Sequence, residues 1–349
     1  MEGSNLNRGT GRQPGLDLIR VFASLSVVAV HFYLNCNYYQ TPLVGGKMFI
    51  MTVGRWFFMV CVPLFMMLTG YLKINKTFCA AHFKSLIPIG FSYVLIAILK
   101  VLISNLYYGK GYYSLWTAFK AIATYQIAWY VGMYVGLTLL IPFLNQLWEA
   151  LDDSMRKYLL LILLLVCCVP SLIPFVVPSY WQMLYPIFYY YAGAYIRTYR
   201  PKINALWLIA AILGATGAGS VISFVSGQGA LFDWNVLAGV DSGYPALPVA
   251  IATVSMFLLL YQVEVLSGGM AKILQTVSSV SLEVYLFTGV FDVVIFSLLK
   301  NQLHYEMATE FFWWFAVTVP VNFLLSVCCG LGVKKLYELG NGLVIRGNK

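Results

Sequence analysis

Three ionisable residues lie within one apolar stretch near the beginning of the chain. The stretch GLDLIRVFASLSVVAVHFY contains Asp17, Arg20 and His31. Histidine ordinarily titrates near neutral pH, so it can take up and release a proton during a reaction. Arginine can hold an anion through two parallel hydrogen bonds. The stretch therefore combines an anion-binding group with a proton-transfer base.

The spacing of these residues predicts that they share one face of a helix. Arg20 and His31 are eleven residues apart, which is three turns plus about 20°, and the helical rise separates them by about 16 Å. Asp17 precedes Arg20 by three residues and belongs to the same stripe. Two alternatives stay open: His31 as a structural histidine that bonds to a neighbouring helix, and Arg20 as the partner of Asp17 in a structural ion pair.

The composition excludes a soluble globular protein, a disordered chain and a nucleic-acid-binding domain. Of the 349 residues, 60% are hydrophobic and only 10% are charged, whereas about 25% is typical of soluble domains. The net charge of +9 comes without any Lys/Arg-rich run. We interpret this excess as the basic residues that collect in the cytoplasmic loops of membrane proteins. We therefore expect no nucleic-acid partner, and lipid as the solvent of most of the chain.

Runs of about 20 apolar residues predict an all-α, polytopic membrane bundle of about ten helices. The expected segments are 16–36, 52–72, 86–106, 124–147, 158–178, 181–199, 204–226, 246–264, 278–299 and 308–335. The fifth and sixth are separated only by residues 178–180, which predicts a tight turn between antiparallel neighbours. Most basic residues fall on the side of the N-terminus, which places both termini in the cytoplasm.

This pattern predicts one domain in a plasma (inner) membrane that the chain crosses several times. We expect a cytoplasmic segment over residues 1–15, a transmembrane domain over 16–337 and a cytoplasmic tail over 338–349. No Cys or His spacing fits a metal site. We expect neither a metal nor a permanently bound cofactor.

Other charged and aromatic residues carry two interpretations each. Glu283 and Asp292 are nine residues apart, on opposite helix faces, so they cannot form one carboxylate pair. Glu283 could instead extend to the membrane interface. Lys100 could pair with Asp292 or reach the outer interface.

Aromatic residues and an outer loop give candidates for contact with a sugar. Trp129 and Tyr130 suit an interfacial belt or a sugar-stacking surface. In the loop over residues 227–245, Asp233 and Trp234 would suit sugar hydroxyls and ring faces, although an ordinary exposed loop explains them as well.

The chain resembles the membrane-bound acyltransferase-3 family in five segments that follow the family's order. The first is Arg20-x10-His31, preceded by Leu-Asp. The other four are VPLFMMLTGYL (62–72), AWYVGMYVGLTLLIPFL (128–144), YYYAGAYI (189–196) and SSVSLEVYLFTGVFD (278–292).

The resemblance implies transfer of an acyl group, usually acetyl, from cytoplasmic acyl-CoA to a hydroxyl of a cell-envelope or exported glycan or a lipid-linked sugar. It assigns catalysis to His31 and donor binding to Arg20. The basic residue expected after the second helix is Lys84, with His82 beside it, instead of a run of arginines. We expect Lys84 to bind the donor phosphates together with Arg20. The family's late histidine is replaced in the stretch 285–288.

Further roles follow from that assignment. We expect Asp292 on the acceptor side, with Asp17, Trp129, Tyr130 and Glu283 in support. His31 would act as a general base or would carry the acyl group itself. The general base is favoured because it needs fewer steps. A secondary transporter is the alternative function, since buried charges and proline-broken helices also suit one.

Overall fold

The computed structural model describes residues 13–172, 178–227, 229–233, 237, 243–264 and 267–347, and within these ranges it contains helices and no strand. The helices are α1 (Pro14–Asn35), α2 (Gly45–Phe58), α3 (Cys61–Lys73), α4 (Ala80–Lys84), α5 (Leu86–Tyr108), α6 (Leu115–Ala123), α7 (Trp129–Ala150), α8 (Asp153–Cys168), α9 (Tyr185–Tyr199), α10 (Ala205–Ser226), α11 (Leu247–Tyr261), α12 (Gly268–Ser278), α13 (Ser281–Leu303) and α14 (Phe315–Gly347). Short 3-10 turns lie over Tyr38–Gln40, Val169–Ser171, Ser179–Leu184, Ala308–Glu310 and Phe312–Trp314.

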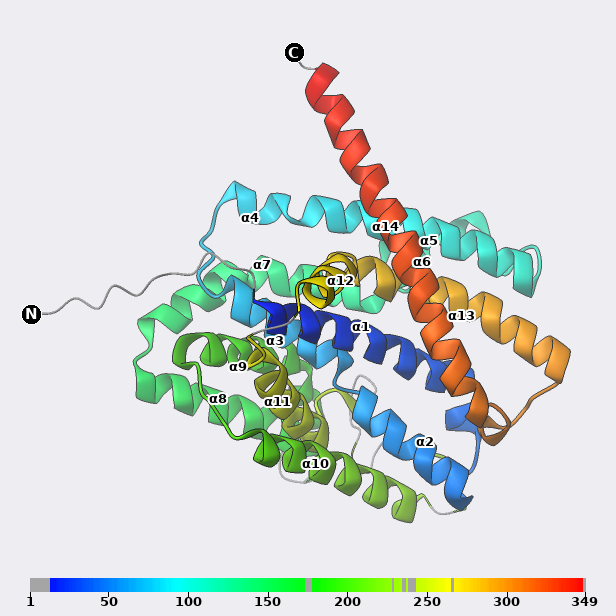
Figure 1. Ribbon diagram of the computed structural model, residues 1–349, viewed down its shortest axis with the longest axis horizontal. Helices are drawn as coiled ribbons and strands as arrows, with labels where there is room; N and C mark the ends of the chain where they lie inside the picture. The colour runs from blue at the N-terminus through cyan, green and yellow to red at the C-terminus, as the bar shows by residue number, and fades with distance from the viewer. Residues whose placement is uncertain are drawn as a thin grey trace, which may run out of the picture.

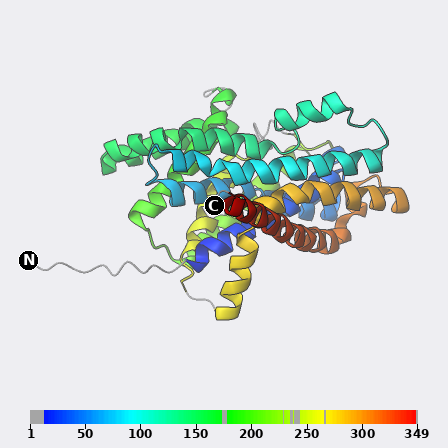
Figure 2. The ribbon, with the colours of Figure 1, turned by 90° about the horizontal axis from the view of Figure 1, so that it is seen from above.

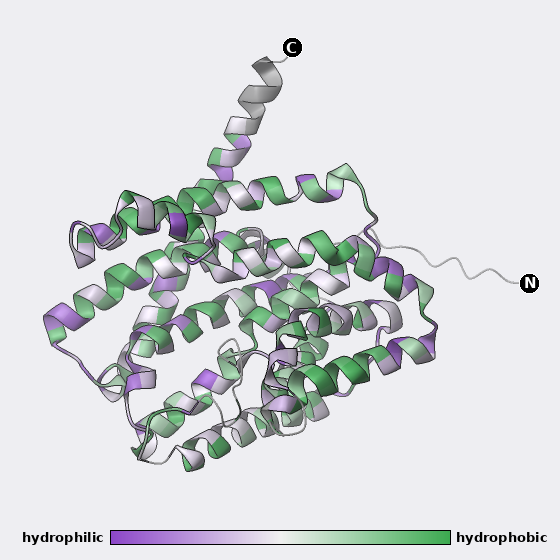
Figure 3. Cartoon of the chain, turned by 180° about the vertical axis from the view of Figure 1, so that it is seen from behind, coloured by the Kyte–Doolittle hydropathy of each residue, from purple (hydrophilic) through white to green (hydrophobic). Residues whose placement is uncertain are grey.

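The chain is a polytopic helical membrane protein. Seven stretches of the described chain are long and apolar enough to cross a membrane: Pro14–Gln40, Gly45–Lys73, Ala80–Tyr108, Trp129–Ala150, Ala205–Ser226, Ser281–Leu303 and Phe312–Gly340. Helices α8, α9 and α11 have 15 or 16 residues, fewer than the about 20 that span a bilayer core upright. Apolar residues cover most of the helical surface, and polar residues gather toward the helix ends (Figure 3).

Helix α1 lies at the centre of the bundle. It packs against α3, α11, α12, α13 and α14. In its most apolar 18-residue stretch 67% of the residues are buried, the same share as in α13. Several long helices run roughly parallel, whereas α14 crosses them obliquely and its C-terminal end projects beyond the bundle (Figure 1). Seen from above, α12 also extends away from the bundle (Figure 2). The centre of the fold is therefore where the polar face of α1 meets α13.

Two glycines allow α3 and α9 to pack with their backbones in close contact. A methyl group placed on Gly70 would lie 1.8 Å from the carbonyl oxygen of Tyr190, and one on Gly193 would lie 1.9 Å from that of Met67. Only glycine leaves enough room for this approach. The two glycines therefore set the position of α3, which lines the wide cavity described below.

The structure corrects two expected segments. One helix was expected over 52–72, but the structure has two. Helix α2 begins at Gly45 and ends at Phe58, and α3 begins at Cys61. Pro63 has no N–H to donate to the carbonyl of residue 59, so a continuous helix is interrupted there. The tight turn at 178–180 is also wrong, because α8 ends at Cys168 and α9 begins only at Tyr185.

The two shortened helices are nevertheless antiparallel neighbours. Tyr199, the last residue of α9, donates a hydrogen bond to Asp153, the first residue of α8. At the other terminus, α14 continues through residue 347, past the expected boundary at residue 337. The expected segment over residues 1–15 lies mostly outside the described residues.

Candidate active site

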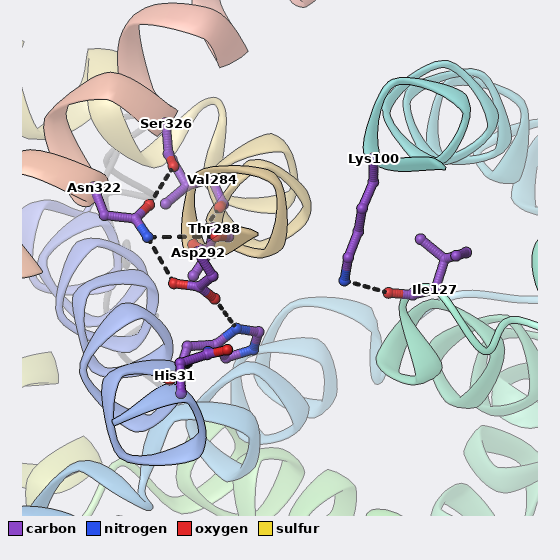
Figure 4. A network of polar contacts seen from close by, with 9 residues as sticks. His31, Lys100, Ile127, Val284, Thr288, Asp292, Asn322 and Ser326 are labelled. Atoms are coloured by element: carbon purple, nitrogen blue, oxygen red, sulfur yellow. Dashed lines mark hydrogen bonds and ion pairs between the residues drawn. The ribbon is translucent and has the colours of Figure 1, made fainter. Parts of the chain in front are cut away.

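His31 is held by a chain of hydrogen bonds that comes from two other helices. Its Nδ1 lies 2.8 Å from Oδ2 of Asp292 on α13. Asn322 on α14 donates to Oδ1 of the same carboxylate at 2.9 Å and to the carbonyl of Thr288 at 3.3 Å. Ser326 donates to Oδ1 of Asn322 at 3.0 Å. Figure 4 shows this network reaching His31 from the side of α13 and α14.

The network determines which nitrogen of His31 is available for chemistry. Asp292 is only 5% exposed, and an ionised carboxylate can only accept hydrogen bonds. When Asp292 is ionised, Nδ1 of His31 carries the proton in this pair, and Nε2 keeps its lone pair. A carboxylate in this position orients the ring and stabilises the imidazolium that forms when Nε2 takes a proton. The pair has the geometry of a general base or a nucleophile.

His31 lines a small enclosed space that we call the narrow cavity. Its volume is about 20 Å³, and its lining residues are His31, Ile96, Ala97, Lys100, Ile127, Ala128, Tyr285, Leu286 and Gly289. A space of this size holds about one water molecule. The imidazole thus faces a confined volume between α1, α5 and α13.

A larger space, the wide cavity, lies on the side of His31 toward the beginning of α1. Its volume is about 310 Å³, and its lining residues are Arg20, Phe65, Leu68, Thr69, Leu72, Lys73, Ile89, Tyr130, Tyr134, Ser281, Leu282 and Tyr285. Its two cationic groups are Arg20 on α1 and Lys73 on the last turn of α3. The ammonium of Lys73 also lies 5.1 Å from the ring centre of Tyr134.

Tyr285 joins the two cavities because it lines both of them. Its ring centre is 6.5 Å from that of His31 and 5.4 Å from that of Tyr130. The backbone N–H of Tyr130 donates a long hydrogen bond of 3.4 Å to the hydroxyl of Tyr285. Two aromatic rings, those of Tyr130 and Tyr285, therefore line the wide cavity, and His31 lies next to the ring of Tyr285.

Asp17 holds the guanidinium of Arg20 at the wall of the wide cavity. The Nη1 atom of Arg20 is 3.0 Å from Oδ1 of Asp17. The same oxygen accepts a 2.7 Å hydrogen bond from Ser278 at the end of α12. The ion pair considered from the sequence is present, and it leaves Arg20 in the lining of the cavity. A structural pair and an anion-binding role are thus compatible.

The structure separates the sequence candidates into two groups. It brings His31 together with Asp292, and Arg20 together with Asp17, while Tyr130 lines the wide cavity. Asp292, which we expected on the acceptor side, bonds to His31 through Oδ2 and to Asn322 through Oδ1. Lys84 is exposed on α4 and lies outside the lining of the wide cavity.

The remaining candidates lie elsewhere. Ser92 on α5 donates to Glu283 at 2.7 Å, so this carboxylate links two helices. Trp129 is 41% exposed and packs against the ring of Tyr244 at 5.7 Å. Asp233 is exposed, and Trp234 lies outside the described residues.

Sequence reasoning missed four residues that complete the site: Lys73, Tyr285, Asn322 and Ser326. Asn322 and Ser326 are four residues apart in the apolar stretch VPVNFLLSV. This spacing places both polar side chains on one face of a helix. That spacing was a usable signal. Lys73 looked like an ordinary basic residue at a helix end, and the sequence carries no sign that it faces inward.

Comparison with known proteins gives one finding about the family. A family model described as an acyltransferase domain, of the acyltransferase-3 type, matches residues 13–331. No curated protein and no solved structure matches the chain. Within the described residues, no group of three or more His, Cys, Asp or Glu side chains could hold a metal ion.

Proposed function

The chain belongs to the acyltransferase-3 family and is a membrane acyltransferase, and from this premise we propose its donor, acceptor and mechanism. The donor is acyl-CoA, in the simplest case acetyl-CoA, which binds from the cytoplasm. The acceptor is a hydroxyl group of a cell-envelope or exported glycan or of a lipid-linked sugar. The membrane is the plasma (inner) membrane, and its lipids surround the bundle.

One observation carries the proposal: a cavity lined by two cations shares Tyr285 with the small space in front of a histidine that a carboxylate orients. The phosphates of the donor would bind Arg20 and Lys73 in the wide cavity. Arginine suits a phosphate because its planar group makes two parallel hydrogen bonds, whereas lysine contributes a point charge. The arm of the donor would then follow the cavity toward Tyr285 and His31.

The distance along α1 supports this placement of the donor. Arg20 and His31 are separated by about 16 Å of helical rise, so no compact group could contact both. In acyl-CoA a long, flexible arm separates the charged phosphates from the neutral thioester. A donor of this shape matches a cavity that is cationic at one end and apolar and aromatic at the other.

The chemical step that we propose uses Nε2 of His31 as the base. Nε2 takes the proton of the acceptor hydroxyl while the hydroxyl oxygen bonds to the carbonyl carbon of the thioester. The carbonyl oxygen of the thioester then becomes negative. The carbon–sulfur bond then breaks, the carbonyl re-forms and the thiolate takes the proton from His31. Asp292 stabilises the imidazolium between these two events.

A labelling experiment tests this function. Membrane vesicles that contain the protein are opened to radiolabelled acetyl-CoA, and label in the glycan fraction and released thiol are measured together. We expect both to appear with the wild-type chain and both to be lost with His31→Ala at equal expression. Thiol release without labelled glycan would overturn the acceptor. Neither signal in well-folded wild-type protein would overturn the acetyl-CoA donor.

Analysis of the cell envelope provides a second test that does not depend on purified material. A deletion strain should lack an acyl group on one envelope or exported glycan, and the wild-type gene should restore it. The His31→Ala gene should fail to restore it. A secondary transporter would show no thioester consumption in detergent solution, where no gradient exists.

A further inference from the structure

Lys100 is a half-buried cation in a membrane-spanning helix, and its presence there needs an explanation. It lies in the middle of α5, within the apolar sequence LIAILKVLIS. Placing a lysine at such a depth costs on the order of 2.5–3.5 kcal/mol on insertion scales. Residues of this kind are retained where they pair with another charge or carry out a function.

The Lys100 side chain turns inward and lines the narrow cavity together with His31. Its Nζ lies 3.4 Å from the carbonyl oxygen of Ile127, just before α7 begins. Figure 4 shows the extended side chain reaching from α5 to this carbonyl, on the side of His31 away from the network of Asn322. The amine therefore stands at the wall opposite to the carboxylate.

Gly289 on α13 makes room for this amine. A methyl group placed on Gly289 would lie 2.7 Å from Nζ of Lys100, so the flexible end of the lysine side chain would have to shift to make room for it. A bulkier side chain at position 289 would require a larger displacement of the amine. The absence of a side chain there thus leaves this space to the ammonium.

The ammonium has little to bond with in the described part of the chain. It makes one long hydrogen bond, although an ammonium has three donors. No carboxylate of the described residues lies within 4.0 Å of it. Asp292 is engaged by His31 and Asn322. Two donors of Lys100 are thus available to a group that enters the narrow cavity.

We propose that Lys100 is a further catalytic residue, which binds the carbonyl oxygen of the donor thioester and stabilises its negative charge during acyl transfer. The inference rests on the proposed function. When the acceptor oxygen bonds to the carbonyl carbon, one electron pair moves to the carbonyl oxygen. The ammonium next to this oxygen stabilises the negative charge that forms there. The electron pair returns when the thiolate leaves, and Lys100 keeps its protons throughout.

The arrangement explains why a cation and a base can share this space. Asp292 behind His31 supports a positive charge on the imidazolium, and Lys100 opposite supports a negative charge on the oxygen. The reacting carbon would lie between them. Asp292 and Lys100 each stabilise a charge that exists only during the reaction. Interactions of this kind raise the rate of acyl transfer rather than the affinity for the donor.

Kinetics of three variants with one matched control test this role. Lys100→Met keeps the length of the side chain and removes its charge. We expect kcat with acetyl-CoA to fall by about 10²- to 10³-fold, the loss typical for one donor to an oxyanion. The KM for acetyl-CoA should stay within about threefold, because the ammonium acts mainly in the transition state. Lys100→Arg should retain part of the turnover.

Lys300→Met is the control. Lys300 is also half-buried, on α13, and its Nζ donates to Asn37 at 2.9 Å. It lines neither cavity, so its replacement should leave kcat nearly unchanged. Gly289→Leu is the third variant. It keeps the charge of Lys100 but fills the space of Nζ, so it should also lower kcat, and its melting temperature is measured alongside.

The outcomes separate this inference from the proposed function. If wild-type protein releases no thiol from acetyl-CoA, the proposed function fails. If wild-type protein is active and Lys100→Met turns over equally fast, only the role of Lys100 fails. A loss of kcat with a proportional rise in KM would make Lys100 a donor-binding residue and overturn the inference. If Lys100→Met does not fold, Gly289→Leu decides, and normal kcat in that variant contradicts the role.

Discussion

The wide and narrow cavities are built by nearly the same helices, yet they differ in size about fifteenfold, with volumes of about 310 and 20 Å³. Helices α1, α5 and α13 contribute to both. Helices α3 and α7 line the wide cavity only, and Ile127 and Ala128, just before α7, line the narrow one. The wide cavity has room for a ligand, and two cations line it. The narrow cavity has room for one small group, and its polar lining residues are His31, Lys100 and Tyr285.

This difference separates binding from chemistry along a single helix. A donor with several charges needs space and cations that tolerate water, and both exist near Arg20. A proton transfer needs a base that cannot turn away, and the bonds to His31 provide this. Tyr285 lines both cavities, so a donor in the wide cavity lies next to this ring before it reaches the narrow cavity. The predictions below test whether the two regions can be damaged independently.

The largest effect is expected from His31→Ala. Removing the base should lower kcat by at least about 10²- to 10⁴-fold, while acyl-CoA still binds in the wide cavity. Turnover with acetyl-CoA and donor binding by isothermal titration check both halves of this statement. His304→Asn is the matched control, since His304 is exposed and has a backbone φ of 54° that asparagine tolerates. Normal turnover of His31→Ala would remove the assignment of the base.

Asp292→Asn should have the next largest effect, a loss of about 10²-fold or more in kcat. An amide has one oxygen and one NH₂ group, so it cannot accept from both His31 and Asn322. One of these two contacts becomes donor to donor, and the ring loses its orientation or its tautomer. Asn322→Ala should cost less, because the bond between Asp292 and His31 survives. Equal losses in these two variants, with lowered melting temperatures in both, would indicate a structural role for the whole network.

A smaller effect, on the donor alone, is expected from Arg20→Ala. The KM for acetyl-CoA should rise by about tenfold or more, since a charge-assisted bond contributes about 1.5–3 kcal/mol. The kcat at saturating donor should change little. Arg20→Lys should be milder, because lysine keeps the charge and loses the planar fork. Unchanged donor affinity together with a much lower melting temperature would assign Arg20 to the structural pair with Asp17.

The smallest effect is expected from Lys84→Ala, and its comparison with Lys73→Ala locates the phosphates of the donor. Lys84 is exposed outside the wide cavity, so its loss should change the KM for acetyl-CoA by less than about twofold, as for a surface charge. Lys73→Ala should raise this KM several-fold. Titration of both variants with acetyl-CoA in detergent decides between them. If Lys84→Ala had the larger effect, the donor would extend over α4 instead of lying against Lys73.

Much of this architecture was predictable from the order of residues alone. Long apolar runs with little charge require helices in lipid, since only helices satisfy their own backbone groups there. The period of the helix also places Asp17, Arg20 and His31 on one face without any tertiary information. That face is indeed the one that meets the cavities. Sequence reasoning was weaker at helix ends, as at Pro63 and between residues 168 and 185, where local turns decide.

Tertiary structure alone decided which residue completes each end of the site. Asp292 is 261 positions from His31. Gly289 lies on the same helix as Asp292, α13, whereas Lys100 comes from α5 and Lys73 from α3. A helical period states which residues of one helix share a face, but says nothing about which helices face each other. That choice depends on packing, such as the close approach of α3 and α9 at Gly70 and Gly193, which orients the lining of the wide cavity. The sequence by itself determined a membrane bundle with a base and an anion-binding group on one helix, and the packing of distant helices determined what surrounds them.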